Sequence, residues 1–242
     1  MGLTVHYKLA APKGCGAAQA KQMVESMRRV ARRFYIEGLV DRVLPVMTDA
    51  KTLRRFACDW LILPVAGEEN TSTGAELLPT EGFIFRVEVG RDCEPLWLGL
   101  CRYPATVHFQ GRELPAKKGA GWQLAGFSKT QYASVHGWEH FQRCHCAVIN
   151  LLAAGRTPDL RVKISDEGDY WPRRSLENLR RNLGQMNGLV AAAAGAWKDE
   201  GAGVESPIFR HPHFERLEAE GEVQHGEALR RTRKVVSNRL GF

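Results

Sequence analysis

The sequence has no apolar run long enough to cross a membrane, which takes about 20 residues. Its longest apolar stretch, Leu189 to Trp197, is about half that length and rich in alanine. The N-terminal residues lack the basic start and apolar core of a signal peptide. Position 6 is His6, where a myristoylation site requires serine or threonine. These absences predict a cytoplasmic protein that does not engage a membrane.

The sequence also lacks paired cysteine motifs. Its six cysteines are scattered at positions 15, 58, 93, 101, 144 and 146, and none forms a CxxC pair. In a reducing compartment such cysteines are expected to be small buried hydrophobic residues. A structural zinc site needs two close ligand pairs, and Cys144-His145-Cys146 is one cluster without a partner. The cysteine pattern therefore predicts no structural zinc site.

Motifs of common enzyme classes are missing. There is no GxSxG elbow, no GxGxxG after a strand, and no P-loop, kinase, EF-hand or zinc-finger pattern. These absences weaken an enzymatic hypothesis, and the sequence indicates no particular cofactor.

The composition is that of an ordinary globular protein with a basic charge. The chain has 242 residues, of which 44% are hydrophobic, and a net charge of +7. Its length fits a single domain over residues 1–242, with a basic tail over 226–242. Six Arg-Arg pairs begin at Arg28, Arg32, Arg54, Arg173, Arg180 and Arg230. Clustered arginine favours an acidic protein or nucleic acid as partner, although arginine also commonly covers a solvated helix surface.

Three long helices are predicted from apolar residues that recur at steps of three and four. They run from about Ala17 to Ile36, Ser134 to Ala154, and Ser175 to Trp197. The third also carries a stripe of small residues, Gly184, Gly188, Ala192 and Gly195. Small residues let another backbone approach closely, so this helix is a candidate surface for self-association into a homo-oligomer.

Alternating and β-branched segments predict strands between the helices. They are Leu3 to Leu9, Arg42 to Met47, Trp60 to Val65, Phe83 to Val89, Leu96 to Cys101, Thr106 to Gln110 and Leu160 to Ile164. Gly67 to Thr80 and Leu114 to Gly121 are predicted loops. The expected fold is α+β, with a largely antiparallel mixed sheet packed against the three helices. The expected core is Val5, Met27, Phe34, Leu61, Ile84, Phe141, Val148, Leu151, Leu179, Leu183 and Val190.

The first candidate site is the loop from Ser165 to Trp171, between a strand and the third helix. Loops that leave a strand beside a helix start often bind ligands. Asp166, Glu167 and Asp169 are close enough in sequence to bind a cation or to raise one carboxyl pKa for acid–base work. Asp-Glu-Gly-Asp is also typical of an exposed turn. The neighbouring Tyr170, Trp171 and Arg173 are candidate ligand-binding residues.

A second candidate lies just before the second helix, where Lys129, Thr130, Gln131 and Tyr132 group an amine, a hydroxyl, an amide and a phenol. This group is able to cradle an anion, or to make ordinary capping and turn hydrogen bonds.

The second helix supplies the third candidate. His136, His140 and Cys144 are spaced four apart, as metal ligands on one helix side would be. His145 falls on the apolar side and is predicted to be buried. Buried histidines are usually core residues with satisfied hydrogen bonds. If it meets the Asp166 loop, a histidine–carboxylate pair with Asp166 and Glu167 becomes a candidate catalytic centre.

Four short segments resemble bacterial proteins without an assigned activity. They are Gly2 to Tyr7, Lys129 to Tyr132, Asp166 to Gly168, and Ser206 to Phe209. The resemblance implies a bacterial, cytoplasmic origin and no particular substrate or cofactor.

Three functional hypotheses follow, in order of preference. The first is a non-enzymatic binding protein that uses a basic surface. The second is a hydrolase-like enzyme with a metal-assisted or acid–base site between residues 166–171, residues 129–132 and His145. The third is a structural subunit that self-associates through residues 175–197.

Overall fold

The computed structural model describes residues 2–64, 72–109, 111–116, 121–199, 201, 203 and 205–225. At its centre is a six-stranded sheet in the order β10-β1-β9-β6-β5-β2, and every neighbouring pair is antiparallel. Its strands are β1 (Thr4–Ala10), β2 (Arg42–Val43), β5 (Glu81–Glu88), β6 (Leu96–Tyr103), β9 (Gly121–Lys129) and β10 (Arg161–Asp166). The α+β prediction is confirmed.

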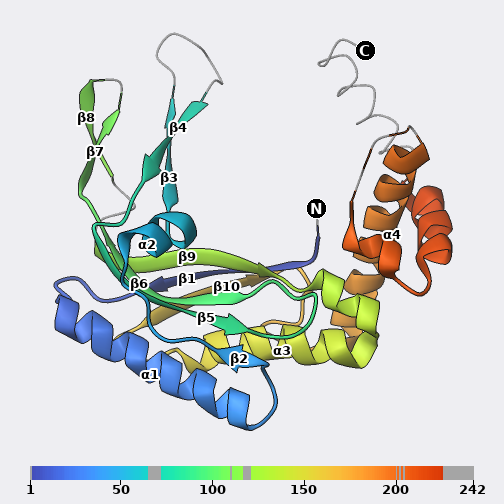
Figure 1. The fold of residues 1–242 in the computed structure, drawn as a ribbon, viewed down its shortest axis with the longest axis horizontal. Coiled ribbons are helices and arrows are strands. Elements are labelled where there is room, and N and C mark those ends of the chain that lie inside the picture. Colours follow the sequence, from blue (N-terminus) through green and yellow to red (C-terminus); the bar gives the residue numbers. More distant parts are fainter. Residues whose placement is uncertain are drawn as a thin grey trace.

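Helices cover the two faces of this sheet unequally. Figure 1 shows α1 (Ala17–Ile36) and α3 (Trp138–Ala154) below the sheet. Above it lie the short helix α2 (Ala50–Phe56) and two hairpins, β3 (Asp59–Pro64) with β4 (Ser72–Leu77) and β7 (Thr106–Phe109) with β8 (Arg112–Pro115). Helix α4 (Leu176–Asp199) stands at one end, after the 3-10 helix η1 (Gln131–His136) in sequence and beside η2 (Pro207–Arg210).

Helix α1 forms where the apolar stripe predicts it. Val24, Met27 and Ala31 are buried against the sheet, because residues three and four apart share one side of a helix. Gly38 follows the helix with a φ of 71°, a left-handed conformation that glycine adopts at little cost.

The second predicted helix begins later than expected. Gly137, with a φ of 95°, separates η1 from α3, so the continuous helix starts at Trp138 and not at Ser134. His136 consequently belongs to η1, and only His140 and Cys144 share the long helix.

Several short elements differ from the prediction. Helix α2 was not predicted, because seven residues are too few to establish a helical period. Strand β4 lies within the expected loop from Gly67 to Thr80, and β8 overlaps the expected loop from Leu114 to Gly121. Val65, Gln110, residues 66–71 and the basic tail over 226–242 lie outside the described residues.

The most consequential strand that was not predicted is β9, because it lies between β1 and β6 in the centre of the sheet. Its two glycines, Gly121 and Gly126, interrupt the alternation that marks a strand. A Cβ atom at Gly126 would lie 2.6 Å from the Tyr7 hydroxyl oxygen, so the Tyr7 side chain occupies the space that any larger residue would need.

The core agrees with the prediction. The structure buries nine of the expected residues: Val5, Met27, Ile84, Phe141, Val148, Leu151, Leu179, Leu183 and Val190. Phe34 is half-buried and packs against this core, whereas the Leu61 side chain lies outside the described part of the chain.

The small-residue stripe of α4 packs against a helix of the same chain, over residues 214–225. A Cβ atom at Gly221 would lie 2.0 Å from the Gly188 carbonyl oxygen, and one at Gly195 would collide with the Glu218 side chain. The backbones therefore approach closely at Gly188 and Gly221. Two glycines that motivated a self-association surface are thus covered within the chain, and self-association itself stays a prediction.

This helix crossing is testable with two equivalent substitutions. We expect Gly221→Ala to lower the free energy of unfolding by about 1–3 kcal/mol, because the added methyl group collides with backbone. Gly184→Ala is the control, since no described atom beyond the local backbone of its own helix lies within 4 Å of its Cβ position. There the better helix propensity of alanine should stabilise the protein by about 0.5–1 kcal/mol. Urea unfolding of both variants distinguishes them, and equal stabilisation by both would contradict the crossing.

Candidate functional site

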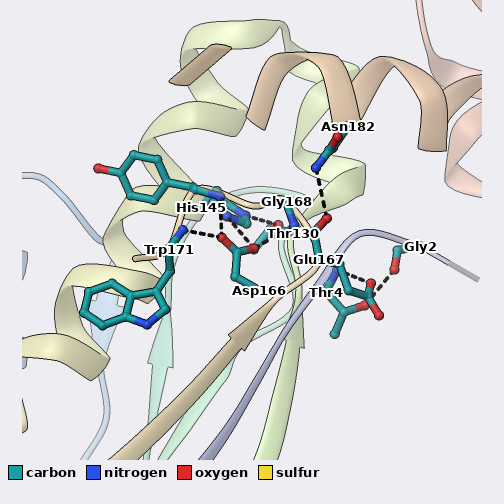
Figure 2. A network of polar contacts seen from close by, with 10 residues as sticks. Gly2, Thr4, Thr130, His145, Asp166, Glu167, Gly168, Trp171 and Asn182 are labelled. Carbon is teal, nitrogen blue, oxygen red and sulfur yellow. Dashed lines mark hydrogen bonds and ion pairs between the residues drawn. The ribbon is translucent and has the colours of Figure 1, made fainter. Parts of the chain in front are cut away.

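Three of the predicted polar segments meet around His145. The Nδ1 atom of His145, on α3, lies 2.9 Å from the Thr130 hydroxyl oxygen, just after β9. Its Nε2 atom lies 3.1 Å from Oδ1 of Asp166, the last residue of β10. Figure 2 shows the three side chains converging, although their residues are far apart in the sequence. We call these three residues the buried triad.

The carboxylate of Asp166 also organises the loop that follows it. Oδ1 accepts a hydrogen bond from the backbone N–H of Gly168 (2.8 Å). Oδ2 accepts from the backbone N–H groups of Tyr170 and Trp171 (2.9 Å each). The expected exposed turn is therefore wrapped around a buried anion, and the loop conformation depends on Asp166.

The charge state of Asp166 follows from these contacts. Burial alone would raise the pKa of its carboxyl group. The contact with His145 and the backbone N–H groups of Trp171 and Gly168 outweigh burial, so the pKa lies below its ordinary value. The Nε2–Oδ1 distance is within the range of an ion pair, but the geometry of the contact does not meet that of a hydrogen bond.

The buried triad has the residue types of a hydroxyl–histidine–carboxylate relay. However, the side chains of His145 and Asp166 are 0% exposed, and Thr130 is equally inaccessible. A relay must reach the atoms of a substrate. These side chains are closed to solvent, so the geometry favours a structural role.

The neighbouring predicted residues divide into buried and exposed groups. The buried Gln131 amide accepts from the Leu3 N–H (2.9 Å) and donates to Asn187 of α4 (2.9 Å). Asp169 accepts from the Asn178 amide (2.8 Å) near the start of α4. These two polar side chains therefore join secondary-structure elements to one another.

The other predicted residues are half-buried or exposed. Glu167 accepts from the Thr4 N–H (2.9 Å) and contacts His6 (3.2 Å). The guanidinium groups of Arg156 and Arg174 each lie 4.8 Å from the centroid of the Trp171 ring. The amine of Lys129 lies 5.9 Å from the centroid of the Tyr132 ring. Tyr170 is half-buried, and its ring centroid lies 6.2 Å from that of His145. Arg173 is exposed.

The histidine set of the second helix is engaged elsewhere. His136 contacts Asp92 (2.7 Å), and His140 contacts the Arg91 carbonyl oxygen (2.9 Å). Cys144 is buried, with its sulfur 3.7 Å from Nε2 of His140. Among the residues described, no three histidine, cysteine or acidic side chains are arranged to hold a metal ion.

On the face opposite α1 and α3, strands β10, β1 and β9 present solvent-facing side chains, which we call the open face. Residues on this face alternate with core residues, because successive side chains of a strand point to opposite sides. Exposed or half-buried members of the open face are Arg161, Lys163 and Ser165 of β10, His6, Lys8 and Ala10 of β1, and Ala125, Phe127 and Lys129 of β9.

At one end of the open face is a hollow of about 590 Å³, the basic hollow. Lys8, Lys13, Arg161 and Lys163 line it, and its described lining contains no carboxylate. Lys8 is directly opposite Lys163 in the antiparallel register. Within the described part of the chain, none of Lys8, Arg161 and Lys163 forms an ion pair.

Two more hollows continue along β9. A hollow of about 580 Å³, the aromatic hollow, is lined by residues including Arg55, Phe56, Trp97 and Phe127. A third, of about 350 Å³, includes Lys129 and Glu167 from the predicted site together with Phe127. Sequence reasoning missed the first two hollows because they depend on the position of β9 and on the strand order.

Comparison with protein families, curated proteins and solved structures finds no match to this chain. The resemblance to bacterial proteins therefore stays a prediction. No helix in the described residues is long and apolar enough to pass through a bilayer.

The structural role of the buried triad is testable by neutralising one carboxylate. We expect Asp166→Asn to lower the free energy of unfolding by about 3 kcal/mol or more, because it neutralises a buried carboxylate that is held by three backbone N–H groups and by contact with His145. Asp159→Asn makes the same chemical change at an exposed position and should alter stability by less than about 0.5 kcal/mol. Chemical denaturation measures both, and a small effect at Asp166 would contradict the assigned role.

The depressed pKa of Asp166 also predicts a pH dependence. A carboxyl group with a lower pKa in the folded state stabilises the fold above its unfolded pKa, and this contribution is lost as the pH falls through the folded pKa. The stability difference between the wild type and Asp166→Asn should therefore shrink below about pH 4. Denaturation from pH 7 to pH 2.5 measures it, and a constant difference would refute the prediction.

Proposed function

We propose that this chain is a non-enzymatic binding protein whose open face binds nucleic acid. The observation that carries the proposal is the direct opposition of Lys8 and Lys163 in the basic hollow. Like charges directly opposite each other on a sheet are destabilising. A bound phosphate backbone would neutralise them and turn the repulsion into attraction.

Charged residues on an edge strand also discourage pairing with another sheet. That explanation suits Arg161 and Lys163, because β10 is at the edge of the sheet. It does not account for Lys8, which is on the inner strand β1, or for Lys13 in the loop that follows β1. The set of four cations therefore favours an anionic ligand over protection of the edge alone.

The Arg-Arg pairs that first suggested a basic surface are spread over several elements. Arg28 and Arg32 are on α1 and Arg54 is on α2, which lie on opposite faces of the sheet (Figure 1). Arg54 is near Glu76 (3.7 Å), and the Arg180 guanidinium packs over the Trp138 ring. The proposal therefore rests on the lysine-rich open face. An acidic protein is the competing partner, and a comparison of DNA with polyglutamate as ligand separates the two.

A hydrolase-like activity is supported less well. Of its proposed catalytic residues, His145 and Asp166 are in contact but have no exposed side-chain surface. The third, Glu167, is exposed and contacts His6, so it is engaged apart from that pair. The chemistry available at the open face is the recognition of anions.

The decisive experiment reverses one charge on the open face. Lys8→Glu places a carboxylate opposite Lys163, so we expect the free energy of unfolding to rise by about 0.2–1 kcal/mol. Binding of a fluorescent 12-nucleotide DNA at 100 mM salt should weaken at least fivefold, because one phosphate contact becomes repulsive. A gain in stability with a loss of binding is an outcome that damage to the fold cannot produce.

Arg32→Glu is the matched control, since it makes the same change in net charge at an exposed position on α1, below the sheet. It should leave DNA binding within about twofold of the wild type. Equal losses in both variants would indicate a response to net charge only and would contradict a specific site. Tight binding of polyglutamate in place of DNA would identify an acidic protein as the partner.

A further inference from the structure

The aromatic hollow contains side chains that a surface for phosphates alone does not require. The rings of Phe56 and Trp97 are stacked, with centroids 4.0 Å apart and planes inclined by 19°. The Arg55 guanidinium carbon lies 5.1 Å from the centroid of the Phe56 ring. Phe127 of β9, which lines the same hollow, is 56% exposed.

The stacked pair and Phe127 differ in their roles within the chain. Phe56 and Trp97 attach α2 to β6, so their contact stabilises the fold in the absence of a ligand. Phe127 has its nearest described ring contact with His6 at 6.2 Å, and more than half of its surface faces water. The apolar surface of Phe127 is therefore available for a flat ligand.

The position of Phe127 connects it with the cations. Residues 121–123 line the basic hollow, and residues 124–127 line the aromatic hollow. A strand rises about 3.4 Å per residue, so Gln123 and Phe127 are about 14 Å apart along β9. One flexible polyanion is able to contact both hollows at once.

We propose that the aromatic hollow binds an unstacked nucleobase, so the ligand of the open face is single-stranded nucleic acid. This inference rests on the proposed function and names its ligand class. The base stacks on Phe127, and the phosphates that follow it contact Lys8 and Lys163. In a duplex the bases are stacked on one another and their faces are not accessible, whereas a single strand presents them to aromatic side chains.

The inference is tested with Phe127→Ala and a 12-nucleotide oligo(dT), measured by fluorescence anisotropy. Loss of base stacking should weaken binding by about 5- to 100-fold. Phe127→Tyr keeps the ring and should bind within about twofold of the wild type. Tyr35→Ala is the control, because Tyr35 is another exposed aromatic residue (53%), on α1 below the sheet, and it should have no effect.

Two further ligands test whether the nucleobase comes from a single strand, a duplex or a free nucleotide. A 12-base-pair duplex should bind the wild type at least about tenfold more weakly than the single strand, and its affinity should not change in Phe127→Ala. Thymidine monophosphate should bind at least about 100-fold more weakly than the oligonucleotide, because it reaches only one hollow. The inference would be overturned if the duplex or thymidine monophosphate bound the wild type as tightly as the single-stranded oligonucleotide does.

The two proposals fail in different ways. If Phe127→Ala retains full affinity for oligo(dT) while Lys8→Glu loses it, the single-strand inference is wrong and nucleic-acid binding remains. If the wild type binds neither single strand nor duplex, the proposed function is wrong.

Discussion

The contact between Asp166 and His145 is the constraint on which the arrangement depends. It joins the end of β10 to α3, and the hydrogen bond between His145 and Thr130 extends the connection to the end of β9. Strand β1 lies between these two strands and pairs with both. The buried triad therefore sets how three strands from distant parts of the sequence lie against α3. A buried charge costs a large desolvation free energy unless it is paired, and Asp166 meets this cost with His145 and three backbone N–H groups.

The same constraint explains why the two faces of the sheet differ. On the helix side, α1, α3 and the buried triad use the inward side chains of β1, β9 and β10, such as Val5, Leu124 and Val162. The alternate residues of these strands face the other way, where α2 covers part of β5 and β6. Lys8, Lys163 and Phe127 remain in contact with water as a direct consequence of the strand period.

Periodic features of the sequence predicted most of the fold. The stripes of α1 and α4, the alternation of β1 and the burial of His145 are local patterns that are readable within a few turns or residues. Strand β9 was not predicted because the glycine at position 126 depends on Tyr7, a residue distant in the sequence. The Tyr7 side chain fills the space that a Cβ atom at position 126 would need. A glycine of this kind has the sequence signature of a loop although it lies in a central strand. The candidate site was correspondingly half predicted: the triad residues were identified individually, whereas the open face was not.

The open face was not predictable from composition, because it depends on which residues of neighbouring strands lie opposite each other. Lys8 and Lys163 are neighbours only through the register of β1 and β10, and neither lies in one of the Arg-Arg pairs that dominate the charge of the sequence. A like-charge pair on adjacent strands opposes folding slightly, whereas the buried triad supports it strongly. Because the stabilising and destabilising electrostatic contacts are on opposite sides of the same three strands, a substitution on the open face alters the charge of that face without disturbing the contacts that hold the strands. This separation is the physical reason why binding and stability are expected to respond in opposite directions here.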